Sequence, residues 1–202
     1  MIYFVRRSFE ADENKITHKK HLKDSVNGIL KSAFKAMGIE YSENCLSYGS
    51  HGKPYLKNHS DVYFNISHCH EMAVAAICNS EIGIDVENIR EYRPRVAKKV
   101  FSERENMILQ ASENPNETFF RIWTLKESFV KAIGIGISYP MKTCEFLLND
   151  NGFSVNGCDG FTFRQIIVND KFICSVCVKA PDRPENNFCK INTDEFSFNL
   201  NL

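Results

Sequence analysis

Hydrophobic and polar residues alternate along the segment Ile82 to Glu87. Its aliphatic residues share one face of a predicted strand, while Gly83, Asp85 and Glu87 share the other. The aliphatic face suits a protein core, and the glycine leaves room for a ligand or another backbone. The two carboxylates lie roughly 7 Å apart along the strand, so they repel each other unless a cation or a proton lies between them. The pattern therefore predicts a strand that holds a divalent metal ion.

The same periodicities assign the other elements. Apolar residues at helical spacing predict helices, and short apolar or alternating runs between turn residues predict strands. We expect helices over residues 17–37, 95–100, 102–111 and 117–133, and strands over 2–5, 62–66, 73–78, 82–87, 144–148, 153–155, 161–168 and 172–178. The run 73–78 is almost continuously apolar, which indicates a central strand. Asn169-Asp170 predicts the hairpin turn between the last two strands.

Both halves of the chain follow one order, which is a strand, a helical region and then further strands. This order predicts an α+β fold with two similar lobes, although no exact sequence repeat is present. The lobes are expected over residues 1–80 and 81–202, and the strand with Asp85 opens the second one.

Charge and hydropathy narrow the classes of partner. Lysine plus arginine number 25, as do aspartate plus glutamate, among 202 residues. This balance excludes a global basic field for nucleic acid, so a polyanionic partner requires a local basic pocket. No apolar run is long enough to span a bilayer, and the N-terminus resembles a first strand more than a signal peptide. We therefore expect a cytoplasmic protein without nucleic-acid or membrane partners.

The eight cysteines are scattered through apolar segments. Cys174 and Cys177 form a Cys-x-x-Cys, but they point to opposite faces of a predicted strand, and no second pair completes a zinc site. We interpret the cysteines as free, buried thiols.

The helix over 117–133 carries the second group of candidate residues. Trp123, Glu127 and Lys131 are spaced i, i+4 and i+8, so they lie on one line along the helix. The tryptophan is expected to be largely buried, so Glu127, one turn further along the same line, would lie next to buried surface. The simpler alternative is a surface pair of Glu127 and Lys131, worth a few tenths of a kcal/mol.

The segment with Ser67, His68 and His70 and the loop with Lys53 each allow more than one interpretation. Ser67 and His68 are adjacent on an extended chain and point apart, so a hydrolytic Ser-His dyad is disfavoured. His68 and His70 suit either metal ligation or a structural role. Lys53 lies between Gly and Pro in a turn-rich loop, where it is either aimed at a ligand or an ordinary surface lysine.

Five segments together resemble a known family: Gly52-Lys53-Pro54, Phe64-Asn65-Ile66-Ser67-His68, Gly83-Ile84-Asp85-Val86-Glu87, Phe101-Ser102-Glu103-Arg104-Glu105, and Trp123-Thr124-Leu125-Lys126-Glu127-Ser128-Phe129-Val130-Lys131. In this order and at these separations the chain resembles the 4′-phosphopantetheinyl transferases, specifically the two-lobed type that activates surfactin synthetase. The resemblance covers about residues 48 to 180 and is weak before them.

The resemblance implies an activity and a metal. The enzyme transfers the phosphopantetheine arm of coenzyme A to a serine hydroxyl of an acyl or peptidyl carrier protein, and adenosine 3′,5′-bisphosphate leaves. Asp85, Glu87 and Glu127 are implied to hold Mg²⁺, which prefers hard oxygen ligands. A monomer is implied, with the active-site cleft between its two lobes.

Other roles follow from the same resemblance. Glu105 is the candidate base, with Lys126 and Glu127 as rivals, although Ser102-x-x-Glu105 also reads as a helix capping box. The candidates that hold coenzyme A are Lys23, Lys53, Ser67, His68 and Lys131.

The chain departs from the family in its first part. The N-terminal segment is shorter, and the arginine of the family's first helix has Lys23 as its nearest match. The family's small residues after Ser-His are replaced by Cys69 and His70.

Two other activities remain open. One is a coenzyme A-binding protein without turnover, and the other is a Mg²⁺-dependent phosphohydrolase that uses the same acids. The sequence does not indicate which carrier protein, and hence which biosynthetic pathway, is served.

Overall fold

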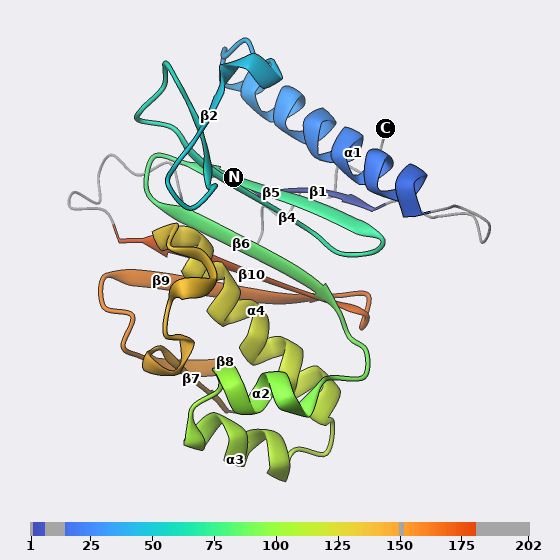
Figure 1. The fold of residues 1–202 in the computed structure, drawn as a ribbon, viewed down its shortest axis with the longest axis vertical. Coiled ribbons are helices and arrows are strands. Elements are labelled where there is room, and N and C mark those ends of the chain that lie inside the picture. Colours follow the sequence, from blue (N-terminus) through green and yellow to red (C-terminus); the bar gives the residue numbers. More distant parts are fainter. Residues whose placement is uncertain (1, 7–14, 150–151, 181–202) are drawn as a thin grey trace.

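The computed structural model describes residues 2–6, 15–149 and 152–180. Two antiparallel three-stranded sheets pack face to face, with one long helix on the outer face of each (Figure 1). The first half contains β1 (Ile2–Arg6), α1 (Lys15–Ala36), β2 (Leu46–Tyr48), β3 (Pro54–Leu56), β4 (Tyr63–His68) and β5 (Met72–Cys78). The second half contains β6 (Ile82–Asn88), α2 (Pro94–Val100), α3 (Glu103–Ala111), α4 (Pro115–Ile133), β7 (Glu145–Asn149), β8 (Gly152–Asn156), β9 (Phe161–Val168) and β10 (Phe172–Lys179).

The two main sheets have the same topology. In the order β1-β5-β4, the last strand of the first half, β5, is central and pairs with the first strand, β1, on one side and with β4 on the other. The order β6-β10-β9 repeats this scheme in the second half. The prediction of an α+β fold with two similar halves is therefore confirmed. The predicted boundary at residue 80 falls between β5 and β6, and as a division into lobes it stays a prediction.

Burial follows the strand alternation. Val74 and Ala76 of β5 lie in the core between the sheets, while Ala73 and Ala75 pack toward α1. Every residue of β5 is buried, which confirms the predicted central strand. Cys174 faces the core between the sheets and Cys177 faces α4, so the two thiols of the Cys-x-x-Cys lie on opposite faces, as predicted.

Helix α4 lies directly on β6. Asn114 caps its start and Gly134, in the left-handed conformation, ends it. A Cβ atom at Gly83 would lie only 2.0 Å from the carbonyl oxygen of Ser128. The glycine of the Asp85 strand therefore makes room for a helix backbone, one of the two neighbours that the sequence allowed.

Some expectations were incomplete or wrong. The short hairpin of β2 and β3 lies in a segment that the sequence indicated only as turn-rich. Cys144 and Cys158 form a disulfide across the base of the β7–β8 hairpin, so the assignment of free thiols is wrong for this pair. Trp123 is half-buried, where we expected a largely buried ring, because it lines an open cavity. Cys189 lies outside the described residues.

Among the described residues, no helix combines the length and the apolar character needed to cross a membrane.

Candidate active site

The two sheets meet where β4 lies beside β6. Asn65 Oδ1 accepts a hydrogen bond from the Ile84 amide at 2.9 Å, and Ser67 Oγ accepts one from the Val86 amide at 3.3 Å. Asn65 and Ser67 are two residues apart, so alternation puts both on one face of β4. Their side chains satisfy the amides of the β6 edge in place of a neighbouring strand, which fixes β6 against the first half.

Asp85 is the centre of the polar cluster at this joint. Its Oδ1 accepts from Ser67 Oγ at 2.9 Å and from Lys131 Nζ at 2.6 Å, and Lys131 also donates to Ser67 Oγ at 2.9 Å. The other carboxylate oxygen, Oδ2, is buried without a hydrogen-bond partner. A buried carboxylate oxygen without a donor is costly, so this atom marks a place for a further cation or donor.

Glu87 and Glu127 surround Asp85 with more negative charge. The pKa of Glu127 is raised to about 7, chiefly by burial and also by the neighbouring carboxylates of Asp85 and Glu87, against the opposing effect of Lys131. Burial also raises the pKa of Glu87, although Arg90 Nη1 donates to its Oε2 at 2.7 Å. The ammonium of Lys131 pairs with Asp85 and the exposed guanidinium of Arg90 pairs with Glu87, so two cations accompany three carboxylates.

The three acids do not form a closed metal site as they stand. Among the residues that the structure describes, no three His, Cys, Asp or Glu side chains converge closely enough to hold one ion. The cation against Asp85 is Lys131, whose ammonium lies between that carboxylate and Ser67.

Two open cavities adjoin Glu87 and Arg90, which line both. The first, of about 610 Å³, is otherwise lined by His68, Cys69, His70, Asn88 and Ile89. The second, of about 230 Å³, has a largely aromatic wall and is otherwise lined by Glu91, Tyr92, Arg93, Val96, Phe119, Phe120 and Trp123. Of the three acids, Glu87 therefore lies where ligands can approach from two directions.

Glu105 and Lys126 form a separate, sealed pair. Lys126 Nζ lies 2.9 Å from Glu105 Oε2, and the side chains are 1% and 0% exposed. Glu105 completes the capping box with Ser102 and accepts from the Phe146 amide at 2.8 Å. Lys126 donates to the carbonyl groups of Met141 and Cys144. Burial lowers the pKa of Lys126 and Glu105 raises it.

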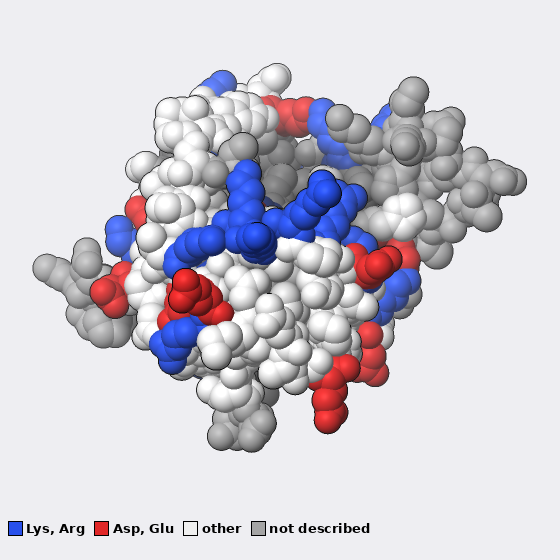
Figure 2. All heavy atoms as spheres, turned by 60° about the horizontal axis from the view of Figure 1, so that its bottom comes forward, with Lys and Arg blue, Asp and Glu red and all other residues white. Residues whose placement is uncertain are grey.

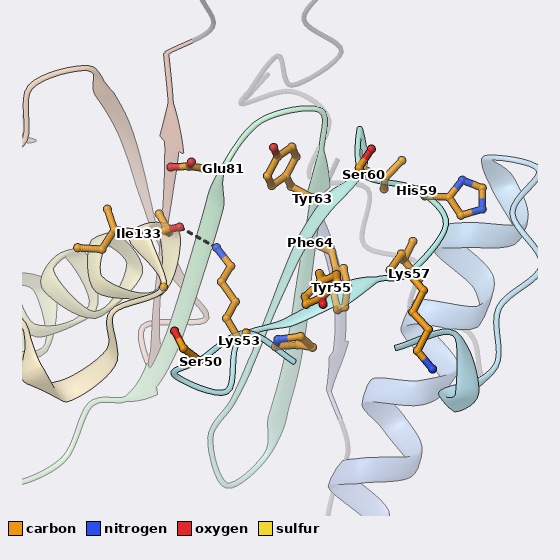
Figure 3. Close-up of a pocket in the computed structure, with 16 residues that line it drawn as sticks. Ser50, Lys53, Tyr55, Lys57, His59, Ser60, Tyr63, Phe64, Glu81 and Ile133 are labelled. Atoms are coloured by element: carbon orange, nitrogen blue, oxygen red, sulfur yellow. Dashed lines mark hydrogen bonds between the residues drawn. The ribbon is translucent and has the colours of Figure 1, made fainter. Parts of the chain in front are cut away.

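The lysines predicted in the first half lie apart from the acids. Lys53 Nζ donates to the carbonyls of Ile82 at 2.9 Å and Ala132 at 2.7 Å, across the joint between the halves (Figure 3). Lys23 is exposed on α1 and forms a 3.0 Å ion pair with Glu43. The structure thus brings together Asp85, Glu87, Glu127, Lys131 and Ser67, with His68 on the adjoining cavity.

Sequence reasoning missed Arg90 and the structural role of Asn65. Arg90 contacts Glu87 and lies over the ring of Phe120, with its guanidinium carbon 4.6 Å from the ring centroid. The only signal was its spacing of three residues from the second acid of the strand. Asn65 shares a strand face with Ser67, and that alternation was readable.

Comparisons with known proteins identify the family. The model of the 4′-phosphopantetheinyl transferase superfamily matches residues 81–177. A 4′-phosphopantetheinyl transferase of Bacillus subtilis is 33% identical over 160 residues, covering 76% of this chain and 71% of that protein. The 4′-phosphopantetheinyl transferase gsp of Aneurinibacillus migulanus is 34% identical over 170 residues, covering 78% and 70%.

Among solved structures, the holo-[acyl-carrier-protein] synthase of Thermotoga maritima aligns with a TM-score of 0.43 and 22% identity, over 50% of this chain and 63% of that one. The family assignment rests on the two relatives, since each is at least 30% identical and more than two thirds covered. This chain belongs to the 4′-phosphopantetheinyl transferase superfamily.

Proposed function

We propose that this enzyme transfers the 4′-phosphopantetheine arm of coenzyme A to a serine hydroxyl of a carrier protein and releases adenosine 3′,5′-bisphosphate. The observation that carries the proposal is the gathering of Asp85, Glu127 and Lys131 with Glu87, which lines two open cavities. Phosphoryl transfer depends mainly on positioning and on stabilising charge. The acids can bind a cation and the ammonium can bind phosphate oxygens, and together they would provide both the positioning and the charge stabilisation.

The acids have the donor chemistry of a magnesium site, although the three side chains do not converge on one point as they stand. Asp85 Oδ2 is buried without a partner, and burial raises the pKa of Glu87 and of Glu127, so a cation beside these acids would favour their charged forms. Hard carboxylate oxygens are the ligands that Mg²⁺ prefers, and the ion usually keeps positions for water and substrate phosphate. When bound, Mg²⁺ would neutralise negative charge on the pyrophosphate. We propose Asp85, Glu87 and Glu127 as the residues that hold it.

Lys131 and His68 are the proposed contacts to coenzyme A. Lys131 carries the ammonium beside Asp85, and a flexible lysine can turn from that carboxylate to a phosphate oxygen as a point charge. His68 is exposed on the 610 Å³ cavity that adjoins the acids. Ser67 is buried under Asp85 and Lys131 and supports both side chains. Lys23, on an exposed part of α1, is the least supported of the five candidates.

We propose Glu127 as the group that accepts the serine proton, directly or through a water. Glu105 is fully buried, and each of its carboxylate oxygens already accepts from a backbone amide. Lys126 is bound to Glu105 and to two carbonyls and is equally sealed. A base must come within hydrogen-bond reach of the attacking hydroxyl, and of the three candidates only Glu127 lies beside the open cluster.

The carrier protein is proposed to approach over α2. Figure 2 shows Lys and Arg side chains gathered in a band on this face of the molecule. The exposed cations of α2 and the segment before it are Arg90, Arg93, Arg95, Lys98 and Lys99. This local basic surface adjoins the 230 Å³ cavity and suits an acidic partner despite the balanced net charge.

The deciding experiment incubates the protein with coenzyme A, Mg²⁺ and a panel of apo carrier proteins, and reads the intact mass of each carrier. The expected result is a mass increase of one phosphopantetheine arm on at least one carrier, lost when its serine is replaced by alanine. Coenzyme A binding without a mass increase on any carrier would overturn the proposal and favour a protein that only binds coenzyme A. Release of phosphopantetheine without a carrier would favour a phosphohydrolase.

We further propose a cytoplasmic monomer without nucleic-acid or membrane partners. Residues from both predicted lobes, 1–80 and 81–202, build the joint at Asp85 within one chain, so the site needs no second copy. Sedimentation in the presence of coenzyme A would test the monomer.

A further inference from the structure

We propose that Lys53 is a positioning residue that clamps the first half of the chain to the strand and helix carrying Asp85 and Glu127, and that it is not a phosphate ligand. Its ammonium donates to the Ile82 carbonyl at 2.9 Å and to the Ala132 carbonyl at 2.7 Å. These acceptors lie 29 and 79 residues away along the sequence. One side chain thus ties a loop of the first half to the start of β6 and the end of α4.

The acceptors suit a lysine. Ala132 lies in the last turn of α4, where carbonyls lack helical partners and the helix dipole favours a cation. Lys53 passes close to the helix end, since a Cβ atom built at Gly134 would lie 3.2 Å from its Cδ. Figure 3 shows the side chain reaching from its loop toward α4, along the wall of a 420 Å³ cavity. Burial lowers the pKa of Lys53 to about 8, against the opposing effect of Glu81.

The clamp acts on the two elements that carry the acids. Helix α4 contacts β6 backbone to backbone at Gly83, one residue beyond Ile82. Along α4, Glu127 precedes Ala132 by five residues, about 7.5 Å of helix rise. Along β6, Asp85 follows Ile82 by three residues, about 10 Å. Releasing the ammonium would therefore loosen the spacing of β6 and α4 close to the acids.

The position of the ammonium argues against a phosphate contact. Ile82 lies five residues before Glu87, about 17 Å along an extended strand. The Lys53 ammonium is bound at the far end of β6 from the cavity that His68 lines. A lysine held by two carbonyls would have to break both hydrogen bonds before it could bind a phosphate there.

The test compares Lys53→Met with Lys57→Met. The control lysine is exposed, in the same segment, and donates to only one carbonyl, that of Asn44. For Lys53→Met we expect the melting temperature to fall by about 5 °C or more, because two charge-assisted hydrogen bonds are lost. We also expect kcat to fall and the half-saturating Mg²⁺ concentration to rise, each by about 3- to 10-fold, since loss of this order follows from small misplacement of ligands. The KM for coenzyme A at saturating Mg²⁺ should stay within about twofold.

The opposite pattern overturns the proposal. A rise of about tenfold or more in the KM for coenzyme A, with the melting temperature and kcat unchanged, would make Lys53 a phosphate ligand. A variant equal to wild type in every measurement would equally overturn it. If Lys53→Met does not fold, Lys53→Arg keeps the donors and should show the same changes in smaller amount.

The proposal rests on the proposed function for the role of the acids, and the two can fail separately. The melting temperatures of Lys53→Met and Lys57→Met test the clamp without any turnover. Loading of a carrier by the wild-type protein tests the function alone.

Discussion

Helix α4 carries two lysines that pair with carboxylates on other elements, and the two pairs differ in almost every other respect. Lys126 and Glu105 are sealed, with every carboxylate oxygen accepting and the ammonium donating to two further carbonyls. Lys131 and Asp85 are partly open, and Asp85 keeps one buried oxygen without a partner. The first pair fastens α3, α4 and β7 together. The second lies beside Glu87, which lines two cavities, and it has unsatisfied binding capacity.

The difference shows how to separate structure from chemistry among buried charges. A buried ion pair with complete hydrogen bonding has little left to offer a substrate, and removing one partner leaves an uncompensated charge. Where the negative charge of a cluster beside a cavity is incompletely compensated, a cation or substrate gains the most binding free energy. Residue type alone does not separate the two pairs, since both combine lysine with a carboxylate. Burial and the remaining hydrogen-bond capacity do.

The largest expected effect is on the sealed pair. Lys126→Met leaves Glu105 charged and buried, so the free energy of unfolding should fall by about 3–5 kcal/mol. Adding Glu105→Gln should recover part of this loss. Urea unfolding measures both variants, with the exposed Lys142→Met as a control that should match wild type. If Lys126→Met instead lost carrier loading while its free energy of unfolding stayed at the wild-type value, Lys126 and Glu105 would have a role in the reaction.

Removing charge from the open cluster should act on activity. Asp85→Asn keeps the shape of the side chain but removes the charge proposed to hold Mg²⁺, so the loading rate should fall about 100-fold or more with the fold intact. The matched control is Glu113→Gln, an exposed acid that lines neither cavity, with an expected change within about twofold. Full activity in Asp85→Asn would contradict the metal assignment. Intact-mass kinetics and circular dichroism give the two readouts.

The pH dependence of stability should distinguish the two clusters. In metal-free protein the pKa of Glu127 is raised from 4.5 to about 7 by burial and by Asp85 and Glu87, against Lys131. The folded state then binds more protons than the unfolded state between these values, so stability should fall as pH rises from about 4.5 to 7. Glu127→Gln should flatten this slope, and Mg²⁺ should restore stability at pH 7.5 in wild type.

Thermal unfolding in EDTA at a series of pH values measures this slope. The exposed Glu113→Gln should keep the wild-type slope. A slope that survives in Glu127→Gln would show that another group is responsible.

The smallest expected effect concerns the hydroxyl under the open pair. Ser67 donates to Asp85 and accepts from Lys131, so Ser67→Ala removes two charge-assisted hydrogen bonds that orient both side chains. We expect the loading rate to fall about 2- to 10-fold. Ser128→Ala on α4, whose hydroxyl donates only to the Leu125 carbonyl, is the control and should keep the wild-type rate. Equal rates in the two variants would remove Ser67 from the site.

Much of the fold followed from local patterns. The alternation in Ile82 to Glu87 placed the aliphatic residues in the core between the sheets and the acids on the side of α4. The helix predicted over 117–133 is α4, Pro115–Ile133, and the predicted hairpin turn at Asn169-Asp170 has both residues at positive φ, 52° each. These features depend on neighbours within a few residues, which a sequence displays directly.

The disulfide and the hydrogen-bond partners of the site residues could not be predicted from local sequence patterns. Cys144 and Cys158 are brought together by the β7–β8 hairpin, a long-range consequence of strand register. Nothing in the order of residues indicated that Lys53 would reach Ala132, 79 residues further on. The resemblance to a family named Glu105 and Lys53 as functional candidates, but it did not reveal what each side chain contacts here.

The sequence alone determined that Asp85 and Glu87 share one strand face, that Glu127 and Lys131 share one helix line, and that the halves have one order of elements. The tertiary structure decided which carboxylate each lysine meets, which pair is sealed and which stays open, and that Gly83 admits a helix backbone. The physical reason is that face and period are set by backbone geometry over a few residues. Burial and hydrogen-bond satisfaction depend on which distant segments pack together, and these two quantities separate a structural charge from a functional one.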